Sequence, residues 1–276
     1  MSALHHDRCL ACGGALIPMF ESPAGPVGRC GGADCHLLQV TDQPSDAALT
    51  ASYERLYYGA AGHDQFRPVK ENSDAFKLRQ HFEALDAEVG LRGRRILDYG
   101  CGIGNFIAVA LENGADAAGI ETNEQARSEA RRKGFRVEGS IDAFAGEQFD
   151  VIYLNDVIEH LRDPVATCAA LRHLLSPGGT IFIATINVAG LKARLLRSKW
   201  DMIQDPTHLY FFSARSLALL LRKAGFDVPR EVNFQVAFSH HGWFRRQLQR
   251  VLVATGLGSS LKMVATAGVS PSAQPR

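Results

Sequence analysis

Residues 95–105, RILDYGCGIGN, place a short apolar run directly before three glycines and the start of a helical pattern. Glycines at such a turn let the backbone approach a ligand closely, at the carboxyl edge of a sheet where α/β folds bind ligands. Short apolar runs and helical segments continue to alternate as far as residue 186. This alternation predicts an α/β fold whose mostly parallel sheet is covered by helices on both faces.

Start and stop residues bound the expected elements. Ser73 to Gly90 is predicted to be a helix, and Asp163-Pro164 opens a later one, because proline in the first turn lacks only an N–H that would be unpaired. Further strands are expected at 95–99, 117–121, 149–154 and 180–186, and further helices at 105–113, 123–133 and 213–225. The residues SPGG at 176–179 are expected to form a turn before the last of these strands.

The chemistry around the glycine loop indicates a cationic nucleoside ligand. Glu121 ends the second expected strand about 20 residues after the loop, where a carboxylate can bind both ribose hydroxyls. A dinucleotide site needs a third small residue, but Asn105 or Ile107 stands there. Asp98 precedes the loop, where it would repel a pyrophosphate and favour a cation such as the amino group of S-adenosylmethionine (SAM). The alternative is a simple glycine turn with a buried, structural Asp98.

Five segments, taken together, are similar to motifs of one enzyme family. They are ILDYGCGIGNF, GIETNEQA, FDVIYLNDVIEHLRDP, LLSPGGTIFIAT and HLYFFSARSLALLLRKAGF. They resemble motifs of the class I SAM-dependent methyltransferases, and the last segment resembles the subgroup of ubiquinone-biosynthesis enzymes. The resemblance covers about residues 50–267. It implies a Rossmann-like, doubly wound sheet with an antiparallel last strand, here expected from Val232 to Phe238 and Leu261 to Ala267.

The resemblance also implies cofactor-binding residues along the carboxyl edge of the sheet. They are Asp98, Gly100, Cys101, Gly102 and Asn155 for the methionine portion of SAM, Glu121 and Thr122 for its ribose, and Ser140, Ile141 and Asp142 for its adenine. SAM carries an activated methyl group, so the protein must align the acceptor and, for a hydroxyl, remove its proton.

Candidate catalytic residues follow the fourth-strand motif. Asp156 and His160 stand four positions apart, so on a helical turn they share a face with Glu159 beside them. One interpretation makes His160 the general base, since an unperturbed imidazole titrates near neutral pH. A second, implied by ubiquinone-type O-methyltransferases, makes the three a magnesium site, and a third gives Glu159 and His160 packing and capping roles only. His208 is expected either over the same pocket or as a loop anchor.

Residues 1–45 carry four of the six cysteines. Cys9-x-x-Cys12, followed by two glycines, is the knuckle of a structural zinc site, and Cys30 and Cys35 supply a second pair. His36 is the alternative to Cys35, because the second pair has a wider loop than usual. The segment resembles the zinc ribbon that precedes the methyltransferase domain in some sugar- and ribosomal-RNA-modifying enzymes. Reduced, unliganded cysteines are the other interpretation.

These patterns predict four regions. They are a zinc-ribbon-like domain at 1–45, a linker and helical segment at 46–90, a methyltransferase domain at 91–269 and a disordered tail at 270–276, with residues 41–50 (TDQPSDAALT) also expected to be a linker. The sequence contains no apolar run long enough to span a membrane and no apolar core of a signal peptide, so a cytoplasmic location is expected.

Charge is distributed unevenly along the chain. Residues 187–276 contain 13 basic and 4 acidic side chains, whereas residues 1–186 contain 17 and 25. The basic third favours either an anionic partner or a solvated helix face. We predict a SAM-dependent methyltransferase acting on a small-molecule or glycan-linked acceptor, at a hydroxyl oxygen. The alternatives are a zinc-ribbon RNA methyltransferase and a non-catalytic SAM-binding protein.

Overall fold

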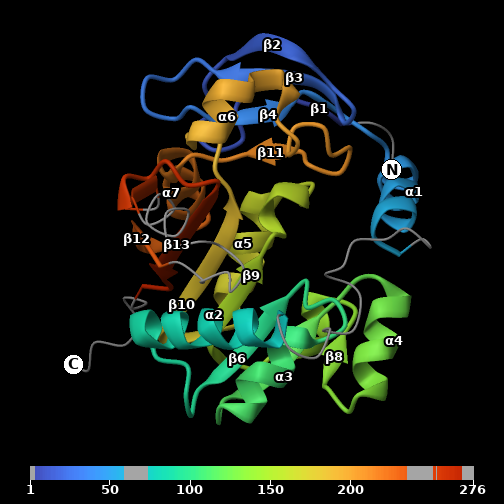
Figure 1. Cartoon of the computed structure of the whole chain (residues 1–276), viewed down its shortest axis with the longest axis vertical. Coiled ribbons are helices and arrows are strands. Elements are labelled where there is room, and N and C mark those ends of the chain that lie inside the picture. Colours follow the sequence, from blue (N-terminus) through green and yellow to red (C-terminus); the bar gives the residue numbers. More distant parts are fainter. Residues whose placement is uncertain (1–3, 59–73, 235–250, 253, 269–276) are drawn as a thin grey trace.

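A seven-stranded sheet forms the centre of the molecule, in a computed structural model that describes residues 4–58, 74–234, 251, 252 and 254–268 (Figure 1). Its strands lie in the order β12-β13-β10-β9-β6-β7-β8. Their bounds are β6 Arg95–Tyr99, β7 Asp116–Ile120, β8 Val137–Glu138, β9 Phe149–Asn155, β10 Leu175–Ile186, β12 Asp227–Glu231 and β13 Ser260–Thr266. Strands β6 to β10 pair in parallel, whereas β13 is antiparallel to β10 and to β12. The predicted mostly parallel sheet with an antiparallel last strand is confirmed.

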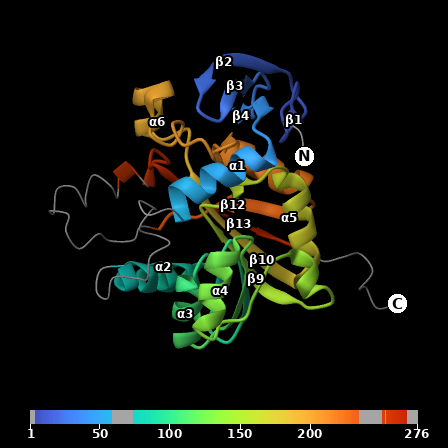
Figure 2. The same cartoon turned by 90° about the vertical axis from the view of Figure 1, so that its right-hand side faces the viewer.

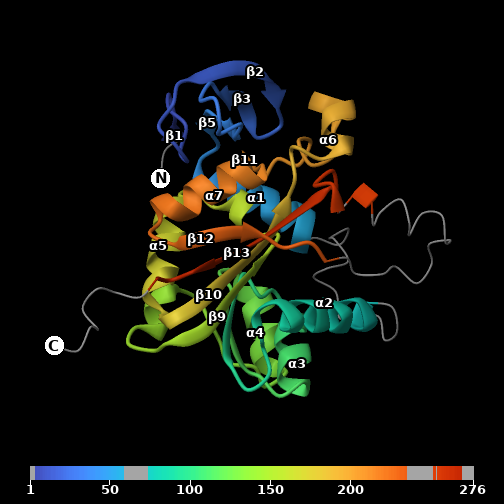
Figure 3. The same ribbon diagram turned by 90° about the vertical axis from the view of Figure 1, so that its left-hand side faces the viewer.

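Helices cover both faces of this sheet (Figure 2). On one face lie α2 (Asp74–Val89), α3 (Asn105–Glu112) and α4 (Glu124–Arg132), and on the other α5 (Pro164–His173) and α7 (Ala214–Lys223), which Figure 3 shows beside α5. Successive side chains of a strand point to opposite faces. In β9, Val151 and Tyr153 therefore pack into the core under α2 and α3, while Ile152 and Leu154 pack into the core under α5 and α7. Burial on both faces explains why these strands are continuous apolar runs in the sequence.

Local side-chain caps start the helices where the sequence predicts them. Asn123 accepts a hydrogen bond from the backbone of the third residue after it at the start of α4, and Asp163 does the same for α5, directly before Pro164. Ser213 and Ser216 form a reciprocal capping box at the start of α7. Such caps pair backbone N–H groups that have no partner inside the helix.

Two elements at the antiparallel side of the sheet, a turn and a strand, are not where the sequence predicted them. The turn predicted at 176–179 lies inside β10, where the register against β9 shifts between Leu175 and Thr180. The strand expected from Val232 is instead β12, which ends at Glu231. The reason is local, because Gly225 adopts a φ of +88° at the end of α7 and turns the chain directly into β12. Residues 235–238 of the expected strand lie outside the described residues.

A second, four-stranded sheet lies at one end of the molecule (Figure 3). It contains β2 (Leu16–Ser22), β3 (Gly25–Cys30), β4 (Leu38–Val40) and, from far along the chain, β11 (Tyr210–Phe211). Beside it, β1 (Leu4–His5) pairs with β5 (Asp42–Gln43). The predicted unit at 1–45 is thus a small β structure that shares its sheet with a strand of the region predicted at 91–269. The boundary between the two units stays a prediction.

The prediction that residues 41–50 are a linker is wrong. Asp42 and Gln43 form β5, and the Ser45 side chain accepts a hydrogen bond from Ala48 N to begin α1 (Asp46–Tyr53). A turn of π-helix follows at η1 (Glu54–Tyr58). The remaining short helices are η3 Ile141–Phe144, η4 Ile158–His160, α6 Leu191–Leu196 and η5 Arg197–Lys199. The predicted tail at 270–276 lies outside the described residues, and none of the described helices is long and apolar enough to cross a membrane.

Candidate active site

A cleft of about 950 Å³ opens at the carboxyl ends of β6, β7 and β9, below α1. This is the edge at which open α/β sheets bind ligands. The described residues that line it are Asp46, Leu49, Thr50, Tyr53 and Glu54 from α1 and η1, Tyr99 and Gly100 at the end of β6, Ile120 to Gln125 from the end of β7 to the start of α4, and Asp156, Val157, His160, Leu161 and Arg162 after β9. Gly100 of the glycine loop and two of the candidate catalytic residues, Asp156 and His160, therefore meet at one cleft.

The glycine loop is held open by backbone hydrogen bonds to the neighbouring strand. The N–H groups of Gly100 and Cys101 donate to the carbonyl of Ile120 at 2.8 and 3.1 Å. Gly100 has a φ of +79°, and a Cβ added there would lie 2.6 Å from the Val157 side chain. Any other residue would be strained and would clash. The loop backbone consequently faces the cleft without a side chain in the way.

Glu121 is fixed in one orientation at the cleft wall. It is 6% exposed, and its carboxylate accepts hydrogen bonds from Gly102 N at 2.9 Å and from Asn123 N at 2.7 Å. Burial raises the pKa of this carboxyl, and the two amide donors oppose that rise because they favour the charged form. Each oxygen still has a lone pair for a ligand hydroxyl. Glu121 is therefore a preorganised acceptor for a diol.

Asp98 lies beneath the loop and is 4% exposed. Burial raises the pKa of Asp98 well above its usual range, and the nearby charge of Glu121 adds to this. A cation bound close by would counter both effects, because an opposite charge favours the ionised carboxylate. Glu121 lines the cleft and Asp98 is buried outside the lining, so a cation bound at this end would favour the ionised form of both acids.

The other predicted cofactor residues have different surroundings. Thr122 lines the cleft, whereas the Cys101 side chain packs against β7, so that a Cβ at Gly119 would lie 2.5 Å from its sulfur. Asn155 ends β9 and donates a hydrogen bond to the Asp156 carboxylate at 2.9 Å. Ser140, Ile141 and Asp142 stand at the start of η3 and are not among the residues that line the cleft. Their roles in binding adenine stay a prediction.

Asp156 and His160 do not lie on a shared helical face, which corrects the sequence-based expectation. Asp156 adopts a φ of +54°, and only residues 158–160 form a helical turn, the 3-10 turn η4. The backbone at Asp156 bonds instead to the neighbouring strand, since its N–H donates to Ala184 O at 2.9 Å. The positive φ directs the chain from β9 into the turn, and both residues still reach the cleft.

Two histidines lie against each other, one in the cleft lining (His160) and one outside it (His208). The ring centroids of His160 and His208 are 4.6 Å apart. His160 Nδ1 lies 3.0 Å from Thr207 O, and His208 Nδ1 lies 2.6 Å from Met202 O. Because a carbonyl only accepts, Nδ1 of each ring donates to its carbonyl, and Nε2 is the acceptor nitrogen of the neutral ring. His208 is buried beside His160 and is not among the described residues that line the cleft, and its bond to Met202 O is the contact expected of a loop anchor.

Glu159 lies next to the two histidines and is fully buried. Thr185 Oγ1 donates a hydrogen bond to its Oε2 at 2.9 Å. Burial and, to a smaller extent, the charge of Asp156 together raise the pKa of Glu159 to about 8. Burial and, to a smaller extent, the neighbouring His208 together lower the pKa of His160 to about 3. At neutral pH, Glu159 is mostly protonated and His160 is neutral.

The donor atoms do not suit the predicted magnesium site. Glu159, His160 and His208 offer ligand atoms within 4.8 Å of one another, but Asp156 is not in this group. Two imidazole nitrogens and one carboxylate are a poor set for Mg²⁺, which prefers oxygen ligands in an octahedron. We therefore assign no step to magnesium.

The sequence-based reasoning missed the residues of α1. Asp46, Leu49, Thr50 and Tyr53 line the cleft, and Asp46 forms an ion pair with Arg162 at 2.9 Å. The Tyr53 and His160 ring centroids are 5.7 Å apart. The sequence does contain a signal for helix α1, because Ser45 directly before the acidic Asp46 is a typical helix start.

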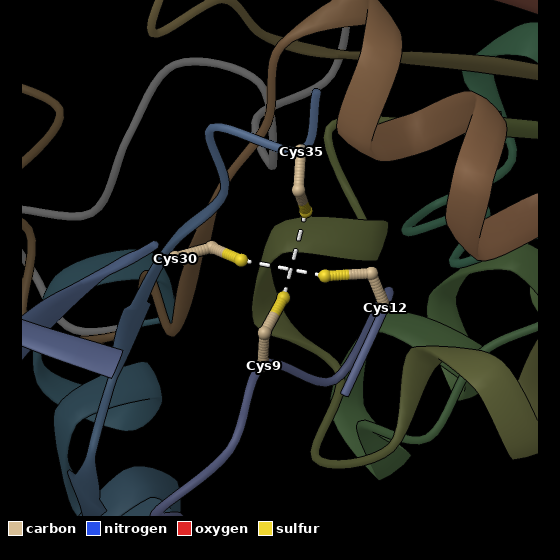
Figure 4. Close-up of side chains that lie close together, drawn as sticks. All are labelled: Cys9, Cys12, Cys30 and Cys35. Atoms are coloured by element: carbon tan, nitrogen blue, oxygen red, sulfur yellow. Dashed lines mark hydrogen bonds between the residues drawn. The ribbon is translucent and has the colours of Figure 1, made fainter. Parts of the chain in front are cut away.

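The four N-terminal cysteines converge on one point (Figure 4). The sulfurs of Cys9 and Cys35 are 3.5 Å apart, those of Cys12 and Cys30 are 3.3 Å apart, and all four lie within 4.8 Å of one another. Tetrahedral zinc with bonds of about 2.3 Å separates its sulfur ligands by about 3.8 Å. Gly32 N also donates to the Cys30 sulfur at 3.3 Å. The residues fit zinc, and Cys35 rather than the exposed His36 is the fourth member.

Comparison with known proteins decides the family. A family model described as a methyltransferase domain matches residues 70–231. The chain belongs to the SAM-dependent methyltransferases. It is 38% identical over 168 residues to a ubiquinone biosynthesis O-methyltransferase of Methylococcus capsulatus, covering 55% of this chain and 70% of the relative. It is 33% identical over 180 residues to the protein of the same name from Aromatoleum aromaticum, covering 59% and 74%.

Solved structures of methyltransferases share the fold. The SAM-dependent methyltransferase of Mesorhizobium loti has a TM-score of 0.52 and 20% identity, covering 68% of this chain and 97% of that one. That of Archaeoglobus fulgidus has a TM-score of 0.52 and 18% identity, covering 80% and 100%. The family model and the curated relatives confirm the predicted SAM-dependent methyltransferase activity. A nucleic-acid acceptor has no support among these relatives.

Proposed function

We propose that this methyltransferase transfers the methyl group of SAM to a hydroxyl oxygen of a small organic molecule. The observation that carries the proposal is the position of His160, which lines the same cleft as Gly100 and Glu121. The relatives named above are O-methyltransferases, which supports oxygen as the acceptor atom.

The donor half of the cleft is formed by the glycine loop and the two acids. In this proposal Glu121 binds the ribose hydroxyls, and Asp98 with Gly100 and Gly102 holds the methionine portion. When bound, SAM supplies a methyl group on a positively charged sulfur, which is a good leaving group. The chain has to hold the acceptor oxygen in line with that methyl and to accept its proton.

His160 is the proposed general base. Its Nδ1–H is held by Thr207 O, so the ring presents Nε2 as the proton acceptor. His208 and Glu159 lie behind it and fix its surroundings. We assign His160 to proton removal, and His208 and Glu159 to positioning.

The lowered proton affinity of His160 restricts the acceptor. Burial and the neighbouring His208 lower the pKa of His160, and this favours an acceptor whose hydroxyl is itself acidic. A hydroxyl on an aromatic ring is more acidic than one on an alkyl carbon or a sugar. Tyr53 and Tyr99 supply aromatic surface in the same cleft. We therefore favour phenolic acceptors over the glycan-linked hydroxyls that the sequence also suggested.

The test compares methyl transfer from labelled SAM to a catechol, to a simple alkyl alcohol and to a sugar alcohol. The proposal predicts methylation of the catechol alone, and loss of that activity in His160→Gln with SAM binding unchanged. His173→Gln is the matched control, because His173 is exposed on α5 and is not part of the cleft lining. Equal transfer to the sugar alcohol, or full activity of His160→Gln, would contradict it.

We also propose that Cys9, Cys12, Cys30 and Cys35 bind one structural zinc ion. The support is the convergence of four sulfurs in a segment with few large apolar side chains. Such a small unit buries too little apolar surface to fold stably without a bound metal or another cross-link. Metal analysis of the purified chain should give one zinc per molecule, and Cys12→Ser should lower it. Two disulfides in place of metal would overturn this assignment.

A further inference from the structure

We propose that the cysteine-bearing ribbon (residues 4–43) positions His160 and His208 for methyl transfer, with Leu209 and Tyr210 as the residues that connect the two. This rests on the proposed function and on the zinc assignment, and goes beyond both, because the ribbon becomes a working part of the acceptor half of the cleft.

The first connection is a continuous path of backbone hydrogen bonds. Strand β4 pairs with β11 in the register Gln39 to Tyr210 and Leu38 to Phe211. At the end of this ladder, Val40 N donates to Leu209 O at 2.9 Å, and Leu209 N donates to Glu159 O at 2.8 Å. Leu209 therefore bridges the ribbon sheet and η4, the turn that carries His160. It also directly follows His208 in the chain.

The second connection runs through one buried tyrosine hydroxyl. Gln43 Nε2 donates to Tyr210 Oη at 2.9 Å, and Tyr210 Oη donates to Arg162 O at 3.0 Å. Gln43 and Tyr210 are both fully buried, so neither can exchange these partners for bulk water. Arg162 lies two residues after His160 and also donates to Pro44 O. The hydroxyl thus ties the last strand of the ribbon to the segment after η4.

The cysteine cluster is anchored to the same strand. The side chain of Gln39, on β4, accepts from Leu10 N at 2.9 Å and donates to Arg8 O at 3.2 Å, which holds the loop around Cys9. Cys30 N donates to Leu37 O at 2.8 Å. On the other side, Ser213 Oγ donates to Cys35 O at 3.3 Å. A change at the cysteines is therefore transmitted directly to β4 and to β11.

The histidines depend on this framework for their orientation. Each ring is held by one carbonyl, Thr207 O for His160 and Met202 O for His208, and both carbonyls belong to the segment that leads into β11. If β11 loses its partner β4, this segment loses one side of its sheet. Small misplacements of a catalytic group reduce rates strongly, by about ten- to hundredfold. The glycine loop and Glu121 directly follow β6 and β7, and are held by bonds among themselves.

The decisive experiment compares three full-length proteins, namely the wild type, Cys12→Ser and the buried non-ligand control Cys168→Ser. For each we would measure zinc content, the dissociation constant for SAM, the imidazole NMR signals of His160 and His208, and kcat with a catechol. The expected result is that Cys12→Ser alone loses zinc, shifts both histidine signals and lowers kcat about ten- to hundredfold, with the SAM dissociation constant within about threefold of the wild type. Loss of zinc with unchanged histidine signals would overturn the proposal.

A second variant leaves the cysteines intact and tests the connection itself. Tyr210→Phe removes only the hydroxyl between Gln43 and Arg162. It should retain zinc and SAM binding, shift the His160 signal and lower kcat, whereas an unchanged His160 signal would overturn the connection. If Cys12→Ser does not fold, zinc removal from the wild type by a chelator gives the same readouts, and global unfolding on chelation would also overturn the proposal. Histidine signals that shift in a protein inactive on every phenol would instead refute the proposed function alone.

Discussion

Replacing Glu121 by alanine tests the donor half of the cleft. The carboxylate is held by Gly102 N and Asn123 N, so its two oxygens face the cleft in a fixed geometry. Removing the hydrogen bonds from two ribose hydroxyls to a charged acceptor is expected to cost about 2–3 kcal/mol. Since 1.4 kcal/mol corresponds to a factor of ten, the dissociation constant for SAM should rise about 30- to 150-fold. Isothermal titration calorimetry measures this change directly.

The same experiment separates the ribose contact from damage to the loop. Glu121→Ala also leaves two backbone N–H groups without their acceptor, which lowers the melting temperature. Titration with S-adenosylhomocysteine and with its 2′-deoxy analogue resolves the two effects, because the variant should lose less affinity for the analogue. Glu129→Ala is the matched control, because Glu129 lies on α4 and is not among the described residues that line the cleft. An unchanged dissociation constant in a folded Glu121→Ala protein would refute the ribose contact.

Three further predictions concern the acceptor half and the ribbon. His160→Gln should lower kcat by about 10²- to 10⁴-fold while leaving the SAM dissociation constant unchanged, and an altered SAM affinity would show a structural role instead. Because the pKa of Glu159 is about 8 in the folded chain and ordinary in the unfolded chain, the folded chain holds one more proton and the free energy of unfolding should fall as pH rises. His160, with its pKa of about 3, has the opposite effect on stability, but only below about pH 6.5. Denaturant unfolding should therefore show that the free energy of unfolding decreases by about 1–2 kcal/mol between pH 6.5 and 8. This decrease should be absent in Glu159→Gln. A chelator should make residues 4–43 sensitive to protease before the remainder of the chain, and equal cleavage with and without chelator would contradict a structural metal there.

Features set by neighbouring residues were predictable from the sequence. The caps at Asn123, Asp163 and Ser213 act within three or four residues of themselves, and the helices that begin at Asn123 and Ser213 end within two residues of the expected positions. The pairing of the glycine loop with Glu121 follows from two adjacent parallel strands. Buried strands such as β9 were visible because both of their faces are apolar.

Features set by long-range contacts were not predictable. Strand β11 has only two residues and exists because β4, from the start of the chain, pairs with it. Helix α1 lies over the cleft because of contacts such as Asp46 to Arg162, which no local pattern shows. The conformation of Asp156, with its positive φ, depends on its backbone bond to Ala184, so the sequence suggested a helical face that the chain does not form.

The central claim is that the cleft directs the methyl group of its donor toward His160. A crystal structure of the chain with SAM bound measures this most directly. The account predicts that the ribose hydroxyls bind Glu121, that the amino group lies near Asp98, and that the methyl carbon faces His160 Nε2 across a space for one acceptor oxygen. A methyl group that points away from His160, toward a different polar side chain, would contradict it.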